Sequence, residues 1–422
     1  MKIVLINPPS PFLGEQKRNP PLGVMYIASF LEEHGYIIEL VDLRDVDEDE
    51  WTNRVPYADI YGITAATPQY PLAVKIAYKL KVRDKKSLIV LGGVHATAEH
   101  KNLDTIFDRV VIGEGEFSTL NLLEDYDKGV RKKYYVSPLI EDLDSLPFPA
   151  RHLLPFDSVF NRNLCVRGKL ATSLMATRGC PYNCAFCASK TMWGRKVRFR
   201  SPDNVSSEIK GVIERYNVYH FKFQDDTITI NKDWILELCK KMEPLNIYWR
   251  ANARVDHSQK EVLEAMYKAG CDEIDYGIED ISEKVLTINN KKVRVEDIYT
   301  AIKNAKEVGL KTRFFFMIGL PGQDRGVAKN IISFLEEARP DAADLSTFIP
   351  FPGCDIYINP SKYNIKLLNT HFGDYVMTVG LYGDETKKDF IYKHDTLTNE
   401  ELKRERLEIL EYIIAHNLSL NK

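Results

Sequence analysis

The segment Thr177–Ser189 reads TRGCPYNCAFCAS and places three cysteines at positions 180, 184 and 187. A predicted strand, 171–177, leads directly into it. Disulfides gain most from closing longer loops, so three thiols at this spacing predict a metal or cluster site instead of crosslinks. Structural zinc takes four protein ligands, and only Cys165 is available nearby as a fourth thiol. An iron–sulfur cubane held by three thiolates keeps an open position on one iron, and an open position favours chemistry over scaffolding.

The sequence around this segment predicts a series of strand–helix units. Apolar runs alternate with amphipathic helical stretches such as NVSSEIKGVIERY (204–216). Six such units predict a partial (β/α)6 barrel over residues 169–364, with chemistry at the carboxyl ends of its strands. The cysteine segment follows the first strand, so we expect it on that rim. The predicted strands are 171–177, 219–224, 246–252, 273–278, 311–318 and 344–349.

The first 130 residues predict a separate flavodoxin-like (Rossmann-type) α/β domain. Five short buried-strand runs, including KIVLINPP (2–9) and SLIVLGG (87–93), alternate in part with helical stretches. The expected strand ends carry glycines and small hydroxyl residues, which let the backbone approach a large ligand closely. Each such turn alone would be ordinary, but four on one edge favour a ligand site. No G-x-G-x-x-G follows the first strand, which disfavours a dinucleotide.

Composition narrows the class further. A formal net charge of −3 and the absence of a basic face argue against nucleic acid as a partner. No apolar run approaches the roughly 20 residues that span a bilayer, so we expect a cytoplasmic protein. The cysteines outside the cluster are scattered, and we expect them to be small buried side chains in a reducing compartment. A proline-rich linker is predicted over 131–168 and a small helical C-terminal region over 365–422.

The C-x3-C-x2-C spacing, with Phe186 before the last cysteine, resembles the radical SAM enzymes. The resemblance implies that Cys180, Cys184 and Cys187 bind a 4Fe–4S cluster whose open iron chelates S-adenosylmethionine (SAM). An electron from a donor such as flavodoxin or ferredoxin then yields a 5′-deoxyadenosyl radical. The strand-end phrases FQDD, WRANAR, YGIED and IGLPG are similar to those of the family, although Asp280 departs from its pattern. For the acidic residues, an ion pair or a helix cap remains the alternative. The implied SAM contacts are Phe186, Asp225, Asp226, Arg250, Arg254, Glu279, Gly319 and Pro321.

The first domain, with the phrases LGGVHAT, IGEGE and LPFPAR, resembles the cobalamin-binding subset of that family. Many cobalamin proteins place a histidine below cobalt through D-x-H-x-x-G, and no such string occurs here. We therefore expect histidine-off cobalamin whose lower face is covered by the loop 64–70. The implied cobalamin contacts are Pro8, Pro9, Thr64, Thr67, Gln69, Tyr70, Gly92, Gly93, Val94, His95, Gly113, Glu114, Gly115 and Glu116.

The combined resemblance implies a class B radical SAM methyltransferase that methylates an unactivated carbon. One SAM would methylate cobalt, and a second would make the radical that removes hydrogen from the substrate. A cyclase, ring-contraction or oxidative enzyme with the same cofactors is the alternative, and a non-enzymatic cobalamin or iron–sulfur sensor is the alternative of another class. Methylthiolation is excluded because residues 1–164 lack the three cysteines that such enzymes carry there.

The substrate is not specified by any motif. Compact members of the subset include enzymes that methylate a residue of a large protein, such as a glutamine of methyl-coenzyme M reductase. A protein or peptide substrate and a small molecule both stay open. The tyrosines at 357, 363, 375 and 382 are a candidate lining of the substrate entrance.

Overall fold

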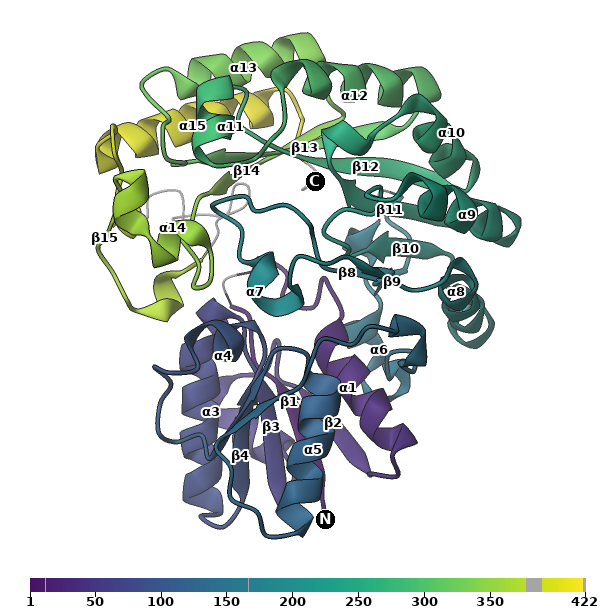
Figure 1. Cartoon of the computed structure of the whole chain (residues 1–422), viewed down its shortest axis with the longest axis vertical. Helices are drawn as coiled ribbons and strands as arrows, with labels where there is room; N and C mark the ends of the chain where they lie inside the picture. Colours follow the sequence, from purple (N-terminus) through teal and green to yellow (C-terminus); the bar gives the residue numbers. More distant parts are fainter. Residues whose placement is uncertain (12, 166, 377–388, 420–422) are drawn as a thin grey trace.

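Two α/β units stack on each other in the computed structural model, which describes all residues except 12, 166, 377–388 and 420–422 (Figure 1). The first unit holds a parallel six-stranded sheet in the order β2-β1-β3-β4-β5-β6. Its apolar strands are covered by helices on both faces, as the continuous hydrophobic runs predict. The strands are β1 (Ile3–Asn7), β2 (Ile38–Asp42), β3 (Ile60–Thr64), β4 (Leu88–Gly92), β5 (Arg109–Ile112) and β6 (Tyr134–Val136).

The strand β6 corrects the predicted organisation. It pairs in parallel with β5, so the first sheet has six strands instead of five and extends past residue 130. Two of its three side chains are exposed, so its short sequence YYV lacks the buried run that marks the other strands. The helices of this unit are α1 (Leu22–Glu33), α2 (Trp51–Arg54), α3 (Tyr70–Arg83), α4 (Val94–Glu99) and α5 (Gly115–Asp127).

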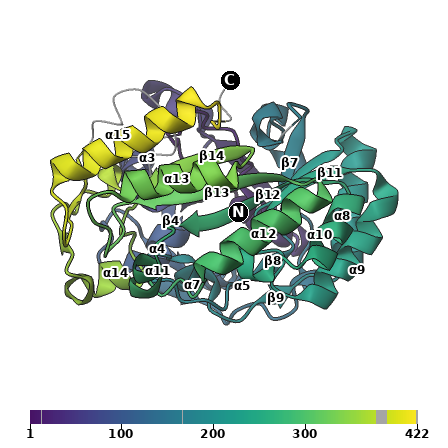
Figure 2. The ribbon, with the colours of Figure 1, turned by 90° about the horizontal axis from the view of Figure 1, so that it is seen from above.

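The second unit is the predicted partial barrel. Its parallel sheet runs in the order β14-β13-β12-β11-β10-β7, and among the described residues β14 and β7 do not pair, so the barrel stays open on one side. Figure 2 shows its helices along the outer face of the curved sheet. The strands β7 (Ala171–Leu174), β10 (His220–Phe223), β11 (Tyr248–Ala253), β12 (Cys271–Glu279), β13 (Lys311–Ile318) and β14 (Ala342–Thr347) confirm the six predicted runs. The helices are α8 (Pro202–Tyr216), α9 (Lys232–Met242), α10 (Lys260–Lys268), α11 (Glu283–Ile288), α12 (Val295–Val308) and α13 (Val327–Ala338).

Short elements complete the chain. The linker contains α6 (Phe156–Val159), and the cysteine segment is flanked by a two-stranded ribbon, β8 (Thr177–Arg178) with β9 (Arg198–Phe199), and by α7 (Ser189–Trp193). After the barrel come α14 (Asp355–Ile358), the hairpin of β15 (Lys366–Leu367) and β16 (Tyr392–Lys393), and the C-terminal α15 (Asn399–Ala415).

The helix α15 packs against α13 and β14. Its N-terminus carries the capping box of Thr398 and Glu401, which satisfies two backbone N–H groups. Across the described residues, the longest and most apolar helices fall short of what a bilayer crossing requires.

Candidate active site

A cavity of about 620 Å³ lies between the two units. It is bounded on one side by the carboxyl ends of β3, β4 and β5 and on the other by α7 and the residues that follow the cysteines. Its volume is in the range of cofactor sites. Because Ala188 and Ser189 line it, the cavity extends from the first sheet to the residues directly after Cys187.

The residues predicted to contact cobalamin fall into two groups, those that line the cavity and those that do not. Nine of them, from the ends of β3, β4 and β5, line it, namely Thr64, Thr67, Gly92, Gly93, Val94, Gly113, Glu114, Gly115 and Glu116. The remaining five do not line it, namely Pro8, Pro9, Gln69, Tyr70 and His95.

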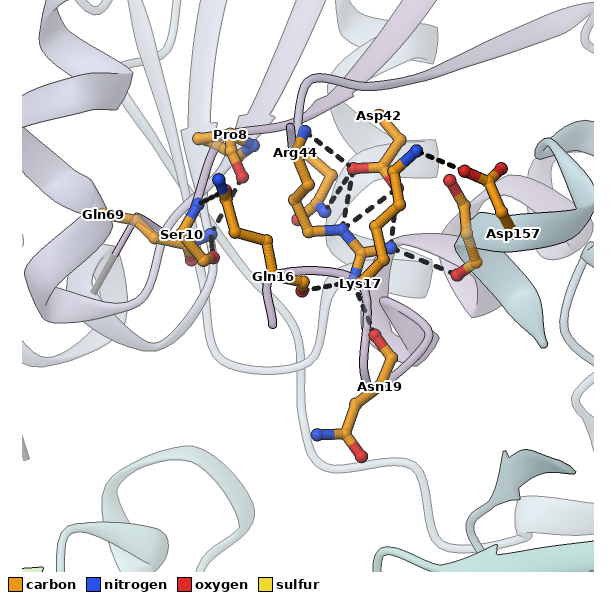
Figure 3. Close-up of polar contacts among 11 residues, drawn as sticks. Pro8, Ser10, Gln16, Lys17, Asn19, Asp42, Arg44, Gln69 and Asp157 are labelled. Atoms are coloured by element: carbon orange, nitrogen blue, oxygen red, sulfur yellow. Dashed lines mark hydrogen bonds and ion pairs between the residues drawn. The ribbon is translucent and has the colours of Figure 1, made fainter. Parts of the chain in front are cut away.

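Four of the five residues outside the cavity interact with other parts of the protein. Gln69 donates from Nε2 to the Pro8 carbonyl (3.1 Å) and to Ser10 Oγ (2.9 Å), which ties the loop after β1 to the start of α3 (Figure 3). Tyr70 stacks on His95 with ring centroids 4.2 Å apart. The predicted contacts of these five residues with the cofactor stay a prediction, and three of the side chains, Gln69, Tyr70 and His95, have partners within the protein.

Two glycines allow the chain to pack tightly at the edge of the cavity. A Cβ on Gly93, whose φ is +92°, would come within 2.8 Å of Thr64 Oγ1, and a Cβ on Gly115 would come within 2.4 Å of Ile27 Cδ1. Both glycines line the cavity, and a side chain at either position would displace a neighbouring residue that lines it, Thr64 or Ile27.

Sequence reasoning missed the apolar walls of the cavity. They extend down the face of the first sheet and include two aromatic residues from opposite units, Tyr26 and Trp193. In the sequence these residues are indistinguishable from ordinary core. The missed lining residues include Ile3, Leu5, Gly62, Val90, Leu122, Leu123, Met175 and Met192.

The cysteine segment crosses the mouth of the barrel. Its backbone is tied at Ala185, which donates from N to the Asn289 carbonyl (2.8 Å) and accepts from Ile356 N (3.1 Å). Cys187 N donates to the Cys184 carbonyl (3.1 Å), so the two thiols belong to one tight turn. The cysteine segment is thus anchored to the segment that follows β12 and to the segment that follows β14, on the far side of the barrel. Neither hydrogen bond requires a bound cofactor.

The donor set fits a cluster better than a single ion. Burial raises the pKa of Cys187 to about 12 and also raises that of Cys180, so these thiols need a metal to ionise. In the part of the chain that the structure describes, no three Cys, His, Asp or Glu side chains converge as they would around one ion. Thiolates on different irons of a cubane stand farther apart than ligands of one zinc ion. Cys165 interacts with Lys169 through its sulfur and does not join the three.

The paired aspartates after β10 differ in role. Asp225 is buried and accepts from Thr177 Oγ1 (2.6 Å) and Ala176 N (3.1 Å), so it holds the start of the cysteine segment. Burial raises its pKa to about 6. Asp226 is exposed, lines the cavity and accepts from Ser189 Oγ (2.5 Å). Of the two, Asp226 is the one open to a ligand.

The two arginines predicted to contact SAM also lie at different positions in the barrel. Arg254 follows β11, lies 3.5 Å from the Tyr182 ring centroid and points Nη1 toward Cys184 Sγ at 4.0 Å. Arg250 is not at the strand end, because β11 continues to Ala253; it is buried in the barrel and donates to Glu273 Oε1 at 2.9 Å. Its predicted contact with SAM therefore finds no support in its position.

The end of β12 approaches the cysteine segment. Glu279 has a φ of +68°, which is unusual for a residue with a side chain, and its carboxylate accepts from Lys291 Nζ at 3.0 Å. Lys291 Nζ lies 5.8 Å from the ring centroid of Phe186. Lys291 thus brings Glu279 and Phe186 into one neighbourhood, and their predicted contacts with SAM stay a prediction.

The loop after β13 is covered by the C-terminal region. Gly319 and Pro321 are both buried. Tyr392 Oη donates to the Gly319 carbonyl (2.7 Å), and a Cβ on Gly319 would collide with that hydroxyl. The predicted approach of this loop to the adenine stays a prediction. Of the candidate tyrosines, Tyr382 lies outside the described residues.

A buried ion network joins the two units beside the cavity. Glu114 accepts from Arg178 Nη1 at 2.7 Å and from Arg198 Nη1 at 2.6 Å, and Glu116 accepts from Arg178 Nη2 at 2.6 Å. All four side chains are at most 4% exposed. The two glutamates, predicted as cofactor contacts, therefore also hold the barrel against the first sheet.

The environment of His95 predicts a pH effect. The ring is fully buried, Nε2 has no hydrogen-bond partner among the described residues, and burial lowers its pKa to about 4. The folded protein takes up this proton only near pH 4, whereas an unfolded histidine takes it up near pH 6.5. Stability is therefore fully present above about pH 6.5 and falls by about 3 kcal/mol as the pH drops to about 4.

His95→Phe should remove this loss, because a phenylalanine can stack between Tyr70 and Phe372 without titrating. Chemical unfolding at pH 7 and pH 4.5 measures the effect, with the exposed His416→Phe as control. An equal pH dependence in wild type and His95→Phe would contradict the assignment. Because His95 does not line the cavity, the absorption spectrum of bound corrinoid should stay unchanged in the same variant.

Comparisons with known proteins agree with this arrangement. A B12 binding domain matches residues 16–122, and the radical SAM superfamily matches residues 174–335. An uncharacterized methyltransferase from Pyrococcus horikoshii is 30% identical over 395 residues, covering 87% of this chain and 84% of the relative. The anaerobic magnesium-protoporphyrin IX monomethyl ester cyclase of Rubrivivax gelatinosus is 28% identical, covering 80% of this chain and 66% of the relative.

Among solved structures, the radical SAM methyltransferase TsrM from Kitasatospora setae, with cobalamin and a 4Fe–4S cluster bound, has a similar fold. Its TM-score is 0.67 at 15% identity, with 86% of this chain and 78% of that chain covered. The two matched domains follow each other in the same order as the two sheets described above.

Proposed function

Since this chain belongs to the cobalamin-dependent radical SAM methyltransferase family, we propose that it transfers a methyl group to an unactivated carbon of its substrate. The family brings a 4Fe–4S cluster, SAM and cobalamin as cofactors. The observation that carries the proposal is the single cavity, which connects the strand ends of the first sheet with the residues after Cys187.

The residues that would hold each group follow from the site. Cys180, Cys184 and Cys187 would bind the cluster, Asp226 and Arg254 would border SAM, and the cavity would hold cobalamin. The chemistry that these groups supply when bound is methylation of cobalt by one SAM and hydrogen removal from the substrate by a radical made from a second.

The protein's own side chains prepare this site electrostatically and sterically. Arg254 places a positive charge beside the Cys184 sulfur, where a bound thiolate is negative. Four residues of the loop 64–70 line the cavity, namely Thr64, Ala66, Thr67 and Pro68, and we propose that this loop covers the lower face of a histidine-off cobalamin. The two units enclose the cavity between them, which limits access of water to a radical.

The experiment that tests the function uses methyl-labelled SAM. The anaerobically reconstituted protein is supplied with a reductant and an extract of the cells that make it. We expect S-adenosylhomocysteine, 5′-deoxyadenosine and a labelled product to form together. Formation of 5′-deoxyadenosine without S-adenosylhomocysteine or label in any product would overturn methyl transfer.

A second candidate is a cyclisation or oxidation with the same cofactors. It is favoured by the similarity to the Rubrivivax gelatinosus cyclase, which covers most of this chain. The labelling experiment distinguishes the two, because a cyclase consumes SAM for radical formation and leaves the product without the label.

The cavity predicts a steric test of cobalamin binding. Gly115→Leu should weaken cobalamin binding by about fivefold to 150-fold, because the new side chain must push Ile27 into the cavity, and overpacking of this kind costs about 1–3 kcal/mol. Gly211→Leu is the matched control, since Gly211 is exposed on α8 with no atom within 4 Å of its added Cβ. Equilibrium titration with hydroxocobalamin measures both. Unchanged affinity in Gly115→Leu would place the corrinoid elsewhere.

A further inference from the structure

The residues that follow β11 place a buried positive charge beside the cysteine segment. Arg254 comes directly after β11, and a single 3-10 turn, Val255–His257, follows it. Arg254 is 6% exposed and Cys184 is 8% exposed, so water screens neither group strongly. Because a guanidinium stays charged in proteins, Arg254 acts on this sulfur as a permanent cation.

Asp256 fixes the direction of this charge. Its carboxylate accepts from Arg254 Nε and from Arg254 Nη2, each at 3.0 Å. Nη1 is the remaining nitrogen, and it points to Cys184 Sγ at 4.0 Å. The carboxylate and the sulfur therefore approach different edges of the planar guanidinium, and the cation stands between them. Asp256 is thus a clamp for Arg254 and also a partial offset to its charge.

The cysteine segment itself closes the clamp. The Tyr182 ring lies over Arg254, whose Cζ is 3.5 Å from the ring centroid. The Tyr182 hydroxyl donates to Asp256 Oδ2 at 3.2 Å and forms a hydrogen bond with His257 Nε2. On another side, Arg254 Nη2 donates to the Lys291 carbonyl at 3.0 Å. The arginine is therefore held by its own turn, by the cysteine segment and by the residues that follow α11.

A fixed cation beside a cluster ligand changes how easily the cluster accepts an electron. Reduction by one electron adds one negative charge to a 4Fe–4S cluster and its thiolates, and the donor, a protein of the flavodoxin or ferredoxin class, loses that electron. A nearby positive charge stabilises the more negative, reduced state and therefore raises the reduction potential. Arg254 is placed to have this effect through a ligand sulfur, whether or not SAM is bound.

We propose that Arg254 raises the reduction potential of the cluster through the Cys184 sulfur, and that Asp256 and Tyr182 are positioning residues that hold the guanidinium there. This inference rests on the proposed function, because it takes the three cysteines as the ligands of a 4Fe–4S cluster. It adds to that function a control on the electron transfer that precedes cleavage of SAM.

The test is a redox titration of the reconstituted protein, followed by electron paramagnetic resonance. SAM is left out, so a contact between Arg254 and SAM cannot contribute to the result. In Arg254→Met, the equilibrium constant of one-electron reduction should fall at least tenfold, which lowers the potential by about 59 mV. In Asp256→Asn, it should rise at least threefold, or by about 28 mV, because asparagine keeps an acceptor oxygen for Arg254 but removes the offsetting charge.

Arg167 provides a matched control at the opposite end of the barrel strands. It also lies over a tyrosine, with its Cζ 3.7 Å from the Tyr248 ring centroid, and its Nε and Nη2 each donate to Asp272 at 2.9 Å. Tyr248 begins β11, whereas Arg254 follows its end. Arg167→Met should therefore titrate like the wild type. Arg254→Lys keeps the charge without the planar fork, so its potential should lie between those of the wild type and Arg254→Met.

The outcomes separate this inference from the function. Iron and sulfide are quantified in every sample, and wild-type protein without a cluster would overturn the proposed function and this inference with it. If the wild-type cluster cleaves SAM, an unchanged potential in Arg254→Met, or shifts of the same sign in Arg254→Met and Asp256→Asn, would overturn this inference alone. If Arg254→Met does not retain its cluster, Asp256→Asn decides: a raised potential supports the inference, and an unchanged or lowered potential overturns it.

Discussion

Cys184→Ala is expected to remove the iron from the protein, from about four atoms per chain to near none. The sulfur of Cys184 is buried in a loop that is already anchored across the barrel. Reductive cleavage of SAM should fall to background, because the open iron that binds SAM depends on the three-thiolate cluster. Iron and sulfide analysis with electron paramagnetic resonance measures the change.

Cys165→Ala is the matched control for this variant. The Cys165 sulfur accepts from Lys169 N at 3.3 Å and stands outside the cysteine segment. This control should keep both iron and SAM cleavage, and Cys184→Ala should still bind cobalamin, because the cavity walls are intact. Full iron content in Cys184→Ala, or its loss in Cys165→Ala, would show that the ligand set is assigned wrongly.

Glu114→Gln is expected to destabilise the protein by about 3–5 kcal/mol, the usual cost of breaking a buried ion pair from one side. Its carboxylate is the partner of two buried arginines, and only Arg178 retains a second carboxylate, that of Glu116. The loss should be largest for contacts between the two units, so cobalamin affinity should fall as well.

Urea unfolding followed by circular dichroism, fitted separately for the two units, measures the effect of Glu114→Gln. Glu141→Gln is the control, since Glu141 pairs with Lys196 at an exposed position between the same parts of the chain. Exposed pairs contribute about 0–1 kcal/mol, so this control should unfold like the wild type. Similar stability of both variants would mean that the buried network does not hold the units together.

The fold was predictable because its strands are buried on both faces. Continuous apolar runs identified all six barrel strands and the first five strands of the N-terminal sheet, whereas the exposed edge strand β6 has no such signal. The cysteine segment could be singled out for a similar reason, since its three thiols are close in sequence. The strands and the cysteine segment can both be recognised from residues that are neighbours in the sequence.

The remainder of the site depends on contacts between distant residues, which a local pattern does not contain. Glu114 follows a glycine at a strand end and resembles a cofactor contact, yet its charge is matched by Arg178 and Arg198 from the other unit. His95 and Tyr70 turn away from the cavity because Phe372, from the C-terminal region, packs against both rings. The cavity walls consist of apolar residues that resemble ordinary core.

The central claim is that one chain holds a three-cysteine cluster and cobalamin on either side of a shared cavity. Its most direct test is quantification of iron, sulfide and corrinoid in the protein purified without oxygen. We expect about four iron and four sulfide per chain, with an equimolar corrinoid whose spectrum shows no histidine ligand to cobalt. Protein that carries neither iron nor corrinoid, after supply of both during expression, would contradict it.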